Sequence, residues 1–235
     1  MQPEYWLESW NEGGTKTDFH RQDVHPFAHL YLPPWELNGK HVFVPCCGKD
    51  NVLTYFRGHA AHVTGIDLAR TAIDQYAAEN NLDLTETAPG RFEADGVTLL
   101  CRDVFTLKPS DIPPIDIVWD RASLIAFPDD GRHSLRRRYV EKMHDLMAPG
   151  SRMLLVTVEY GPPRDETPFS VGKNMVREYF GLGYQIDHLL KLAKPEHRMV
   201  ARFGLRFFSE HGFEMTRRRH QFGADTSRTG AKAFA

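Results

Sequence analysis

The sequence of 235 residues lacks several features that mark whole classes of protein. It has only three cysteines, and two of them (Cys46 and Cys47) are adjacent, which excludes a disulfide framework and the ligand spacing of a zinc site. No apolar run reaches the roughly 18 residues that a membrane-spanning helix requires. The segment from Met1 to Trp6 carries neither the basic nor the apolar part of a secretory signal. We therefore expect a cytoplasmic protein with reduced thiols and no membrane partner.

An excess of charge of either sign is also missing. The 29 Lys and Arg residues nearly balance the 31 Asp and Glu residues, which leaves a net charge of −2. A near-neutral chain offers no general electrostatic attraction to nucleic acid, so no nucleic-acid partner is predicted. Only residues 217–235 carry an excess of one sign of charge, with five basic residues against one Asp. We expect this segment to be a flexible tail, with a basic interaction arm as the alternative.

The chain contains a compact pattern of apolar and turn residues between positions 41 and 67. The apolar run at 42–44 predicts a buried strand that enters a tight turn at Pro45 and Gly48. A helical pattern follows, and a second apolar run ends on Asp67. A βαβ unit of this kind forms a ligand crevice at the carboxyl ends of its strands, and an acidic residue about 20 positions after the glycine turn is placed to bind ribose hydroxyls. The pattern predicts a cofactor that contains a nucleoside.

The glycines of two common nucleotide motifs are missing from this turn. The dinucleotide fingerprint G-x-G-x-x-G is reduced to Gly48 alone, and no G-x-x-x-x-G-K-[ST] sequence occurs. A pyrophosphate needs several amides at close approach, whereas one glycine suits the amino-acid part of S-adenosylmethionine. The spacing therefore favours an adenosyl cofactor, and a nicotinamide oxidoreductase stays the alternative.

The rest of the chain alternates between helical and strand patterns. Such alternation predicts an α/β fold with a parallel sheet covered by helices on both faces. Internal repeats are absent, so residues 1–216 are predicted to form one domain. We expect the protein to be a monomer. The expected elements are a helix at 71–80, a loop or hairpin at 83–96, strands at 97–101, 115–119 and 153–158, a helix at 134–147, a helix after Ser170, and closing strands at 184–192 and 205–215.

The N-terminal 40 residues carry two short helical patterns. Trp6 and Trp10 are four residues apart, so they share one face of the first helix. The favoured interpretation is that both anchor the core, and the functional alternative is a lid that closes over a ligand. His25 and His29 have the spacing of a metal-binding pair on a helix, but no third ligand is visible and no metal is predicted.

Several of these segments together resemble the thiopurine S-methyltransferase family, in the right order over residues 4–216. The resemblance implies the class I methyltransferase fold, with a seven-stranded, mostly parallel sheet and an N-terminal helical lid over residues 1–40. It also implies S-adenosylmethionine as cofactor, S-adenosylhomocysteine as product, and no metal. The segments that carry it are Trp6-x-x-x-Trp10, Phe19-His20, Phe43 to Lys49, Val63 to Asp67, Asp116 to Leu124, and Pro168 to Val171.

The resemblance assigns residues to the cofactor. It implies that Asp67 accepts hydrogen bonds from the ribose hydroxyls, and that the backbone at Cys46 and Gly48 meets the methionine portion. Trp6 and Trp10 would cover the sulfonium. The chain departs from the family at two of these positions, because Asp67 stands where Glu is usual and Cys46 where Leu is usual. We interpret the Cys46 thiol as a small apolar substitute, since nothing in the sequence activates it as a nucleophile.

Further residues are assigned to the adenine and to the boundary with the acceptor. Asp103 and Val104 would frame the adenine, although Val104 also fits plain core. Arg121 would lie between the cofactor and the acceptor, and a surface ion pair with Asp120 is the alternative. Arg121 is therefore one of two catalytic candidates.

The acceptor side is implied less sharply. The resemblance suggests Phe19, His20 and Phe169, together with an arginine before the last strand, for which Arg198 and Arg202 both qualify. His20 is the second catalytic candidate, as a general base, and a hydrogen-bonding strut is the alternative.

The predicted function is methyl transfer to a small soft nucleophile, foremost the sulfur of an aromatic or heterocyclic thiol. Aromatic thiols ionise near neutral pH, so the absence of an evident catalytic dyad fits this chemistry. Two alternatives remain open. One is a methyltransferase for another acceptor, such as a selenium or tellurium species, a halide, or the oxygen or nitrogen of a small metabolite. The other is a binding protein for S-adenosylmethionine without turnover.

Overall fold

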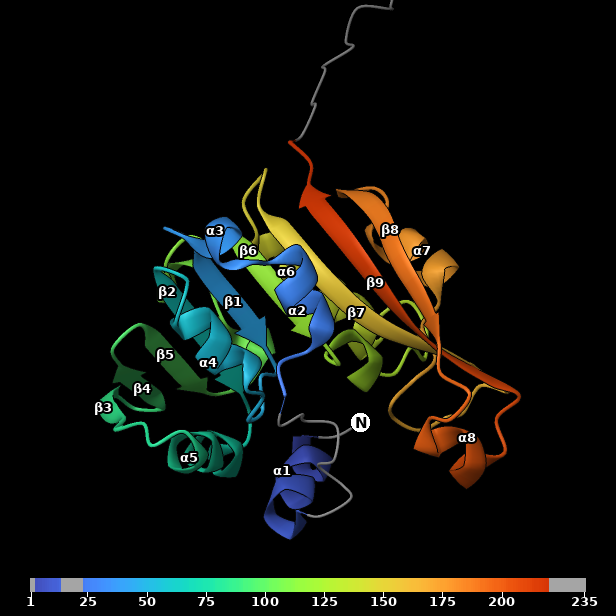
Figure 1. Cartoon of the computed structure of the whole chain (residues 1–235), viewed down its shortest axis with the longest axis horizontal. Coiled ribbons are helices and arrows are strands. Elements are labelled where there is room, and N and C mark those ends of the chain that lie inside the picture. Colours follow the sequence, from blue (N-terminus) through green and yellow to red (C-terminus); the bar gives the residue numbers. More distant parts are fainter. Residues whose placement is uncertain (1–2, 14–22, 220–235) are drawn as a thin grey trace, which may run out of the picture.

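The computed structural model describes residues 3–13 and 23–219 and shows one twisted sheet of nine strands with helices on both faces (Figure 1). The strand order is β3-β4-β5-β2-β1-β6-β7-β9-β8. The strands are β1 (His41–Pro45), β2 (His62–Asp67), β3 (Thr85–Ala88), β4 (Arg91–Ala94), β5 (Val97–Cys101), β6 (Ile117–Arg121), β7 (Arg152–Gly161), β8 (Tyr184–Ala193) and β9 (Phe207–Arg217). The α-helices are α1 (Pro3–Glu12), α2 (Pro26–Tyr31), α3 (Pro34–Leu37), α4 (Val52–Arg57), α5 (Arg70–Glu79), α6 (Leu135–Leu146), α7 (Lys173–Phe180) and α8 (Arg198–Phe203).

The central part of the sheet confirms the predicted α/β class. β5, β2, β1, β6 and β7 pair in parallel, and β9 inserts antiparallel between β7 and β8. All five residues of β1 are buried, as expected for a strand covered on both faces. The carboxyl ends of the parallel strands therefore lie along one edge, where the predicted crevice belongs.

The predicted number of seven strands is wrong by two. Residues 83–96, expected as a loop or hairpin, form the hairpin β3–β4, and β4 pairs antiparallel with β5 over four residue pairs. The hairpin thus extends the sheet at its edge. The other seven strands follow the predicted order of elements. Two details differ from the prediction. α8 was not predicted, and the helix expected after Ser170 is α7, which begins at Lys173, while the Ser170 side chain hydrogen-bonds the backbone of Tyr160.

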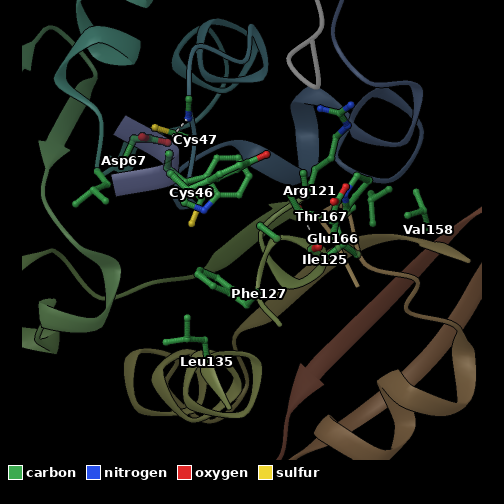
Figure 2. A pocket seen from close by; sticks show the side chains of 18 of the residues that line it. Cys46, Cys47, Asp67, Arg121, Ile125, Phe127, Leu135, Val158, Glu166 and Thr167 are labelled. Atoms are coloured by element: carbon green, nitrogen blue, oxygen red, sulfur yellow. Dashed lines mark hydrogen bonds between the residues drawn. The ribbon is translucent and has the colours of Figure 1, made fainter. Parts of the chain in front are cut away.

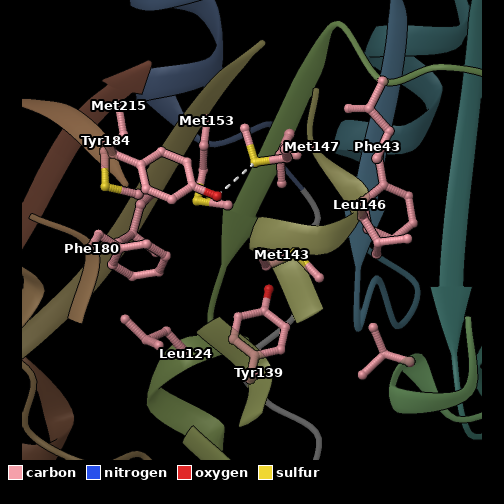
Figure 3. Packing of buried hydrophobic residues seen from close by; sticks show 14 of the residues in the cluster. Phe43, Leu124, Tyr139, Met143, Leu146, Met147, Met153, Phe180, Tyr184 and Met215 are labelled. Carbon is pink, nitrogen blue, oxygen red and sulfur yellow. Dashed lines mark hydrogen bonds between the residues drawn. The ribbon is translucent and has the colours of Figure 1, made fainter. Parts of the chain in front are cut away.

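Two apolar cores lie on opposite faces of the sheet. In the first, α6 and α7 supply Tyr139, Met143 and Phe180, which pack with the methionine-rich ends of β7 and β9 (Figure 3). The second contains side chains of α2, α3, α4 and α5, among them the buried Phe27 and Leu37. The helices α2 to α7 are thus held on the sheet by burial of their apolar faces.

The lid predicted over residues 1–40 is therefore too long. Phe27, Leu32 and Leu37 are 3%, 0% and 0% exposed, so α2 and α3 belong to the core. α1 lies next to α5 instead, to which it is joined by a hydrogen bond of 3.0 Å from the Thr71 hydroxyl to the Asn11 side chain. None of the helices in the described residues combines the length and apolar character of a membrane span.

A buried carboxylate ties the end of β6 to its neighbours. Asp120 is fully buried, and it accepts hydrogen bonds from the Tyr139 hydroxyl (2.7 Å) and the Ser123 amide (3.2 Å). The Ser123 hydroxyl donates in turn to the carbonyl of Pro45 at 3.0 Å. Burial raises the pKa of Asp120 to about 6, although these hydrogen bonds oppose the shift. The network fixes β6, α6 and the end of β1 relative to one another.

The close packing of β2 gives a first prediction. A Cβ at Gly65 would lie 2.9 Å from both Cys47 Sγ and Leu99 Cδ2, so Gly65→Ala overpacks the core. We expect the free energy of unfolding to fall by about 1–3 kcal/mol, measured by chemical denaturation. The control is Gly58→Ala, where the nearest atoms are 3.5 Å away and a change from no effect to about 1 kcal/mol of stabilisation is expected. Equal stability of the two variants would contradict the packing argument.

Asp120 gives a second prediction, on pH. Its pKa of about 6 in the folded protein exceeds the unfolded value of about 3.9. The folded state therefore binds a proton that the unfolded state releases between these values, and stability is lost as the pH rises through 6. We expect the free energy of unfolding of the wild type, relative to Asp120→Asn, to fall by up to about 3 kcal/mol from about pH 4 to about pH 7. Parallel pH profiles of the two proteins would contradict the shifted titration.

Candidate functional site

A cavity of about 980 Å³ opens at the carboxyl ends of the parallel strands. Figure 2 shows Cys46 and Asp67 at one end, Arg121 and Ile125 near the middle, and Val158 at the other end. Its walls combine both strand ends of the βαβ unit with α1, the loop after β7, and α8. The cavity therefore lies where the sequence pattern predicted the crevice.

The glycine turn and the acidic strand end are joined directly. The Gly48 amide donates to Asp67 Oδ2 at 2.8 Å, and the Ala69 amide donates to Asp67 Oδ1 at 2.9 Å. Gly48 has a φ of +51°, and a Cβ at this position would lie 2.9 Å from the indole of Trp10. Both the left-handed backbone and the aromatic contact therefore require glycine here.

Asp67 lines the cavity with capacity left for hydroxyl donors. A carboxylate offers about four acceptor sites, and the two backbone amides of Gly48 and Ala69 take one at each oxygen. Burial raises the pKa of the Asp67 carboxyl above its ordinary value, and the amides of Ala69, Gly48 and Leu68 oppose that shift. A carboxylate held this way is suited to neutral donors, such as a pair of sugar hydroxyls.

Cys46 lies in the same turn with a φ of +45° and lines the cavity. Burial raises the pKa of its thiol well above the ordinary value, and the negative charges of Asp67 and Asp120 add to the shift. The thiol is therefore protonated at neutral pH, as expected for an apolar substitute and not for a nucleophile.

The two tryptophans of α1 both line the cavity. Trp10 is only 3% exposed and packs on Ala69 and Ala72, so it is a core anchor and a cavity wall at once. Trp6 is half-buried. The core-anchor interpretation is thus confirmed for Trp10, and the lid stays a prediction from the sequence.

The predicted adenine and boundary residues line the cavity as well. Asp103 caps the short 3-10 turn that begins at Val104, accepting a hydrogen bond from the Phe105 amide at 2.9 Å. At the end of β6, Arg121 pairs with Asp50 at 3.1 Å, and both side chains are mostly buried. The alternative from the sequence, an ion pair between Arg121 and Asp120, is therefore not formed, because Asp120 points into the core.

The residues predicted for the acceptor side have mixed outcomes. Arg198 and Arg202 of α8 line the cavity. Phe169 does not: its ring lies 5.4 Å from the Arg136 guanidinium, while its neighbours Thr167 and Pro168 line the wall instead. Phe19 and His20 lie outside the described residues.

Several polar residues of the cavity were missed by the sequence reasoning. Lys194 Nζ bonds Glu210 Oε1 at 2.8 Å, and the His197 ring stacks on Phe208 at 4.0 Å; all four line the cavity. The sequence signal that could have revealed this group was Glu210 itself, an acidic residue two positions after Phe208 in the predicted closing strand. Asp50, next to the glycine turn, was the other signal.

The two histidines at the N-cap and in the last turn of α2 do not form a metal site in this structure. His25 Nδ1 accepts the Phe27 amide at 3.2 Å and Nε2 faces Glu210, whereas the His29 ring packs on Tyr55 at 4.7 Å. Across residues 3–13 and 23–219, no group of three or more His, Cys, Asp or Glu side chains is arranged to hold a metal ion.

The fold and the sequence can both be compared with known proteins. The same fold occurs in the crystal structure of a 1,6-didemethyltoxoflavin-N1-methyltransferase of Burkholderia thailandensis, with a TM-score of 0.63 at 14% identity over 92% of this chain and 87% of that one. The magnesium protoporphyrin IX methyltransferase of Synechocystis has a TM-score of 0.61 at 14% identity over 92% and 96%. These likenesses establish the class I S-adenosylmethionine-dependent methyltransferase fold.

Other proteins share a higher sequence identity with this chain than these two structures do. The thiopurine S-methyltransferase of Shewanella woodyi is 37% identical over 196 residues, or 77% of this chain and 85% of that protein. The one from Vibrio atlanticus is 35% identical over 220 residues, or 88% and 94%. The family model described as Thiopurine S-methyltransferase matches residues 1–218. With a match of that length and relatives of that identity, the chain belongs to the thiopurine S-methyltransferase family.

Proposed function

We propose that this protein transfers the methyl group of S-adenosylmethionine to the sulfur of an aromatic or heterocyclic thiol. The observation that carries the proposal is the arrangement of the cavity, in which the linked pair Gly48 and Asp67 lies at one end and Arg121 separates it from an aromatic and basic end. Membership of the family supports methyl transfer and suggests sulfur as the acceptor atom.

In this proposal, the residues around the glycine turn hold the cofactor. Asp67 accepts the ribose hydroxyls, and the backbone at Cys46 and Gly48 meets the methionine portion. Trp6 and Trp10 cover the sulfonium, where an indole face stabilises a cation by roughly 0.5–2 kcal/mol. Asp103 and Val104 frame the adenine. The cofactor, when bound, supplies an electrophilic methyl group.

The protein's own contribution is to position and desolvate the acceptor. Holding two reactants in line removes the entropic cost of their encounter, and the walls of the cavity exclude water. Arg121 presents a guanidinium at the boundary, where it stabilises an anionic sulfur. Because an aromatic thiol ionises near neutral pH, this route needs no strong base, and His20 stays a prediction from the sequence. A methyl-transfer assay with thiophenol and labelled S-adenosylmethionine tests the proposal, and no transfer to any thiol would contradict it.

Asp67 gives the prediction for the cofactor. Asp67→Ala removes shielded, charge-assisted hydrogen bonds worth about 1.5–3 kcal/mol each. We therefore expect affinity for S-adenosylhomocysteine to fall by at least about tenfold in isothermal titration calorimetry. Asp74→Ala is the control, because Asp74 is half-exposed on α5 and pairs with Arg70 outside the cavity. Unchanged affinity in a folded Asp67→Ala protein would rule out the ribose role.

Arg121 gives the prediction for the acceptor. Arg121→Lys keeps the charge and loses the planar fork, which costs about 1.5 kcal/mol for one hydrogen bond to a charged group. We expect kcat/KM for thiophenol to fall by about tenfold, with the affinity for S-adenosylhomocysteine changed less than about threefold. Arg137→Lys, on the exposed face of α6, is the matched control. A loss of cofactor affinity as large as the loss of activity would place Arg121 on the cofactor alone.

A further inference from the structure

Glu210 is a carboxylate at the wall of the cavity. The residue is 8% exposed. Its Oε1 accepts a hydrogen bond from Lys194 Nζ at 2.8 Å and lies 3.3 Å from His25 Nε2. Both contacts converge on the same oxygen. The second carboxylate oxygen makes no hydrogen bond or ion pair within the described part of the chain, and Glu210 lines the cavity. One acceptor oxygen is thus left for a ligand.

The surroundings keep this carboxylate ionised. Burial works to raise the pKa of Glu210, but the neighbouring His25 ring at 3.3 Å and the hydrogen bond from Lys194 outweigh it and lower the pKa to about 2. The Phe27 amide donates to His25 Nδ1, so the proton of a neutral His25 ring lies on Nε2, toward Glu210. Glu210 is therefore a negative acceptor at every pH near neutrality.

The sheet places Glu210 beyond the boundary at Arg121. Three strands (β1, β6 and β7) lie between Asp67 on β2 and Glu210 on β9. Four strand spacings of about 4.8 Å separate the two carboxylates by roughly 19 Å across the sheet. Glu210 pairs with Val158, which Figure 2 shows at the end of the cavity away from Asp67, and paired residues share a face. Glu210 thus belongs to the acceptor end.

The neighbouring wall is flat and aromatic. Phe208 lies two residues before Glu210 on the same face of β9, and the His197 ring stacks on it with a centroid distance of 4.0 Å and an interplanar angle of 5°. Tyr160, the cross-strand partner of Phe208 on β7, lies parallel to it with a centroid distance of 6.1 Å. A planar ring fits against such a wall, with its edge toward Glu210.

We propose that Glu210, oriented by Lys194 and His25, recognises a ring N–H next to the thiocarbonyl carbon of the acceptor, so that the site prefers cyclic thioamides to simple thiophenols. This rests on the proposed function, since it names a residue that discriminates among sulfur acceptors. An ionised carboxylate is the strongest partner for such an N–H donor.

The same contact serves the reaction. As the thione sulfur bonds to the methyl carbon and the carbon–sulfonium bond breaks with its electron pair, the positive charge passes to the N–C–S unit of the acceptor. Glu210 stabilises this charge, and transfer of the N–H proton to the carboxylate and on to water leaves a neutral thioether. A thiophenolate has no such proton and gains nothing from Glu210.

The test compares two acceptors that differ by one ring atom, 2-mercaptopyridine (a thione with N–H) and thiophenol. We expect Glu210→Gln to lower kcat/KM for 2-mercaptopyridine by about 10- to 100-fold and to change that for thiophenol less than about threefold. Calorimetric titration of 2-mercaptopyridine into the protein saturated with S-adenosylhomocysteine is a readout independent of turnover, and its affinity should fall similarly.

The matched control is Glu214→Gln. Glu214 lies on the same strand and pairs with Arg152 at 2.6 Å, but it does not line the cavity. It should leave both acceptors unaffected. Equal losses for both acceptors in Glu210→Gln would show that Glu210 only holds β9 to Lys194 and His25, and no loss would show that it does not meet the ring; either result overturns the inference. No methyl transfer by the wild type to either thiol would instead contradict the proposed function.

Discussion

The hydrogen bond between the Gly48 amide and the Asp67 carboxylate is the constraint on which the site depends. It joins the ends of β1 and β2, and it fixes the glycine turn in a left-handed conformation over which the Trp10 indole packs. Any side chain at Gly48 would displace Trp10, and any loss of the Asp67 carboxylate would free the turn. One bond thus holds the acidic group, the turn and the aromatic wall in a single arrangement.

A second constraint carries this arrangement across the sheet. The buried Asp120 ties β6 to Tyr139 of α6 and, through Ser123, to the end of β1. The next residue, Arg121, is thereby presented at the middle of the cavity, paired with Asp50. The core and the cavity share the end of β6, so the position of the Arg121 guanidinium follows from a hydrogen-bond network in the interior.

Much of the fold and the end of the cavity around Gly48 and Asp67 could be predicted from local sequence. The βαβ unit, the turn at Gly48 and the strand ending on Asp67 follow from hydrophobic periodicity and turn residues, which act over a few positions. Three features did not follow from the sequence. The hairpin at 83–96 joins the sheet because of edge pairing with β5, α2 is core because Phe27 packs on Gly212, and Phe169 turns away from the cavity toward Arg136.

The sequence by itself determined the class of fold, the order of most elements and the residues around the glycine turn, because each depends on patterns within one or two neighbouring elements. Only the tertiary structure decided which distant side chains meet. His25 is a helix cap, Lys194 follows the end of β8, and Glu210 lies within β9, and no local pattern relates them. Their contact exists because β9 inserts between β7 and β8 while α2 packs on its face, and strand order and packing are properties of the whole chain.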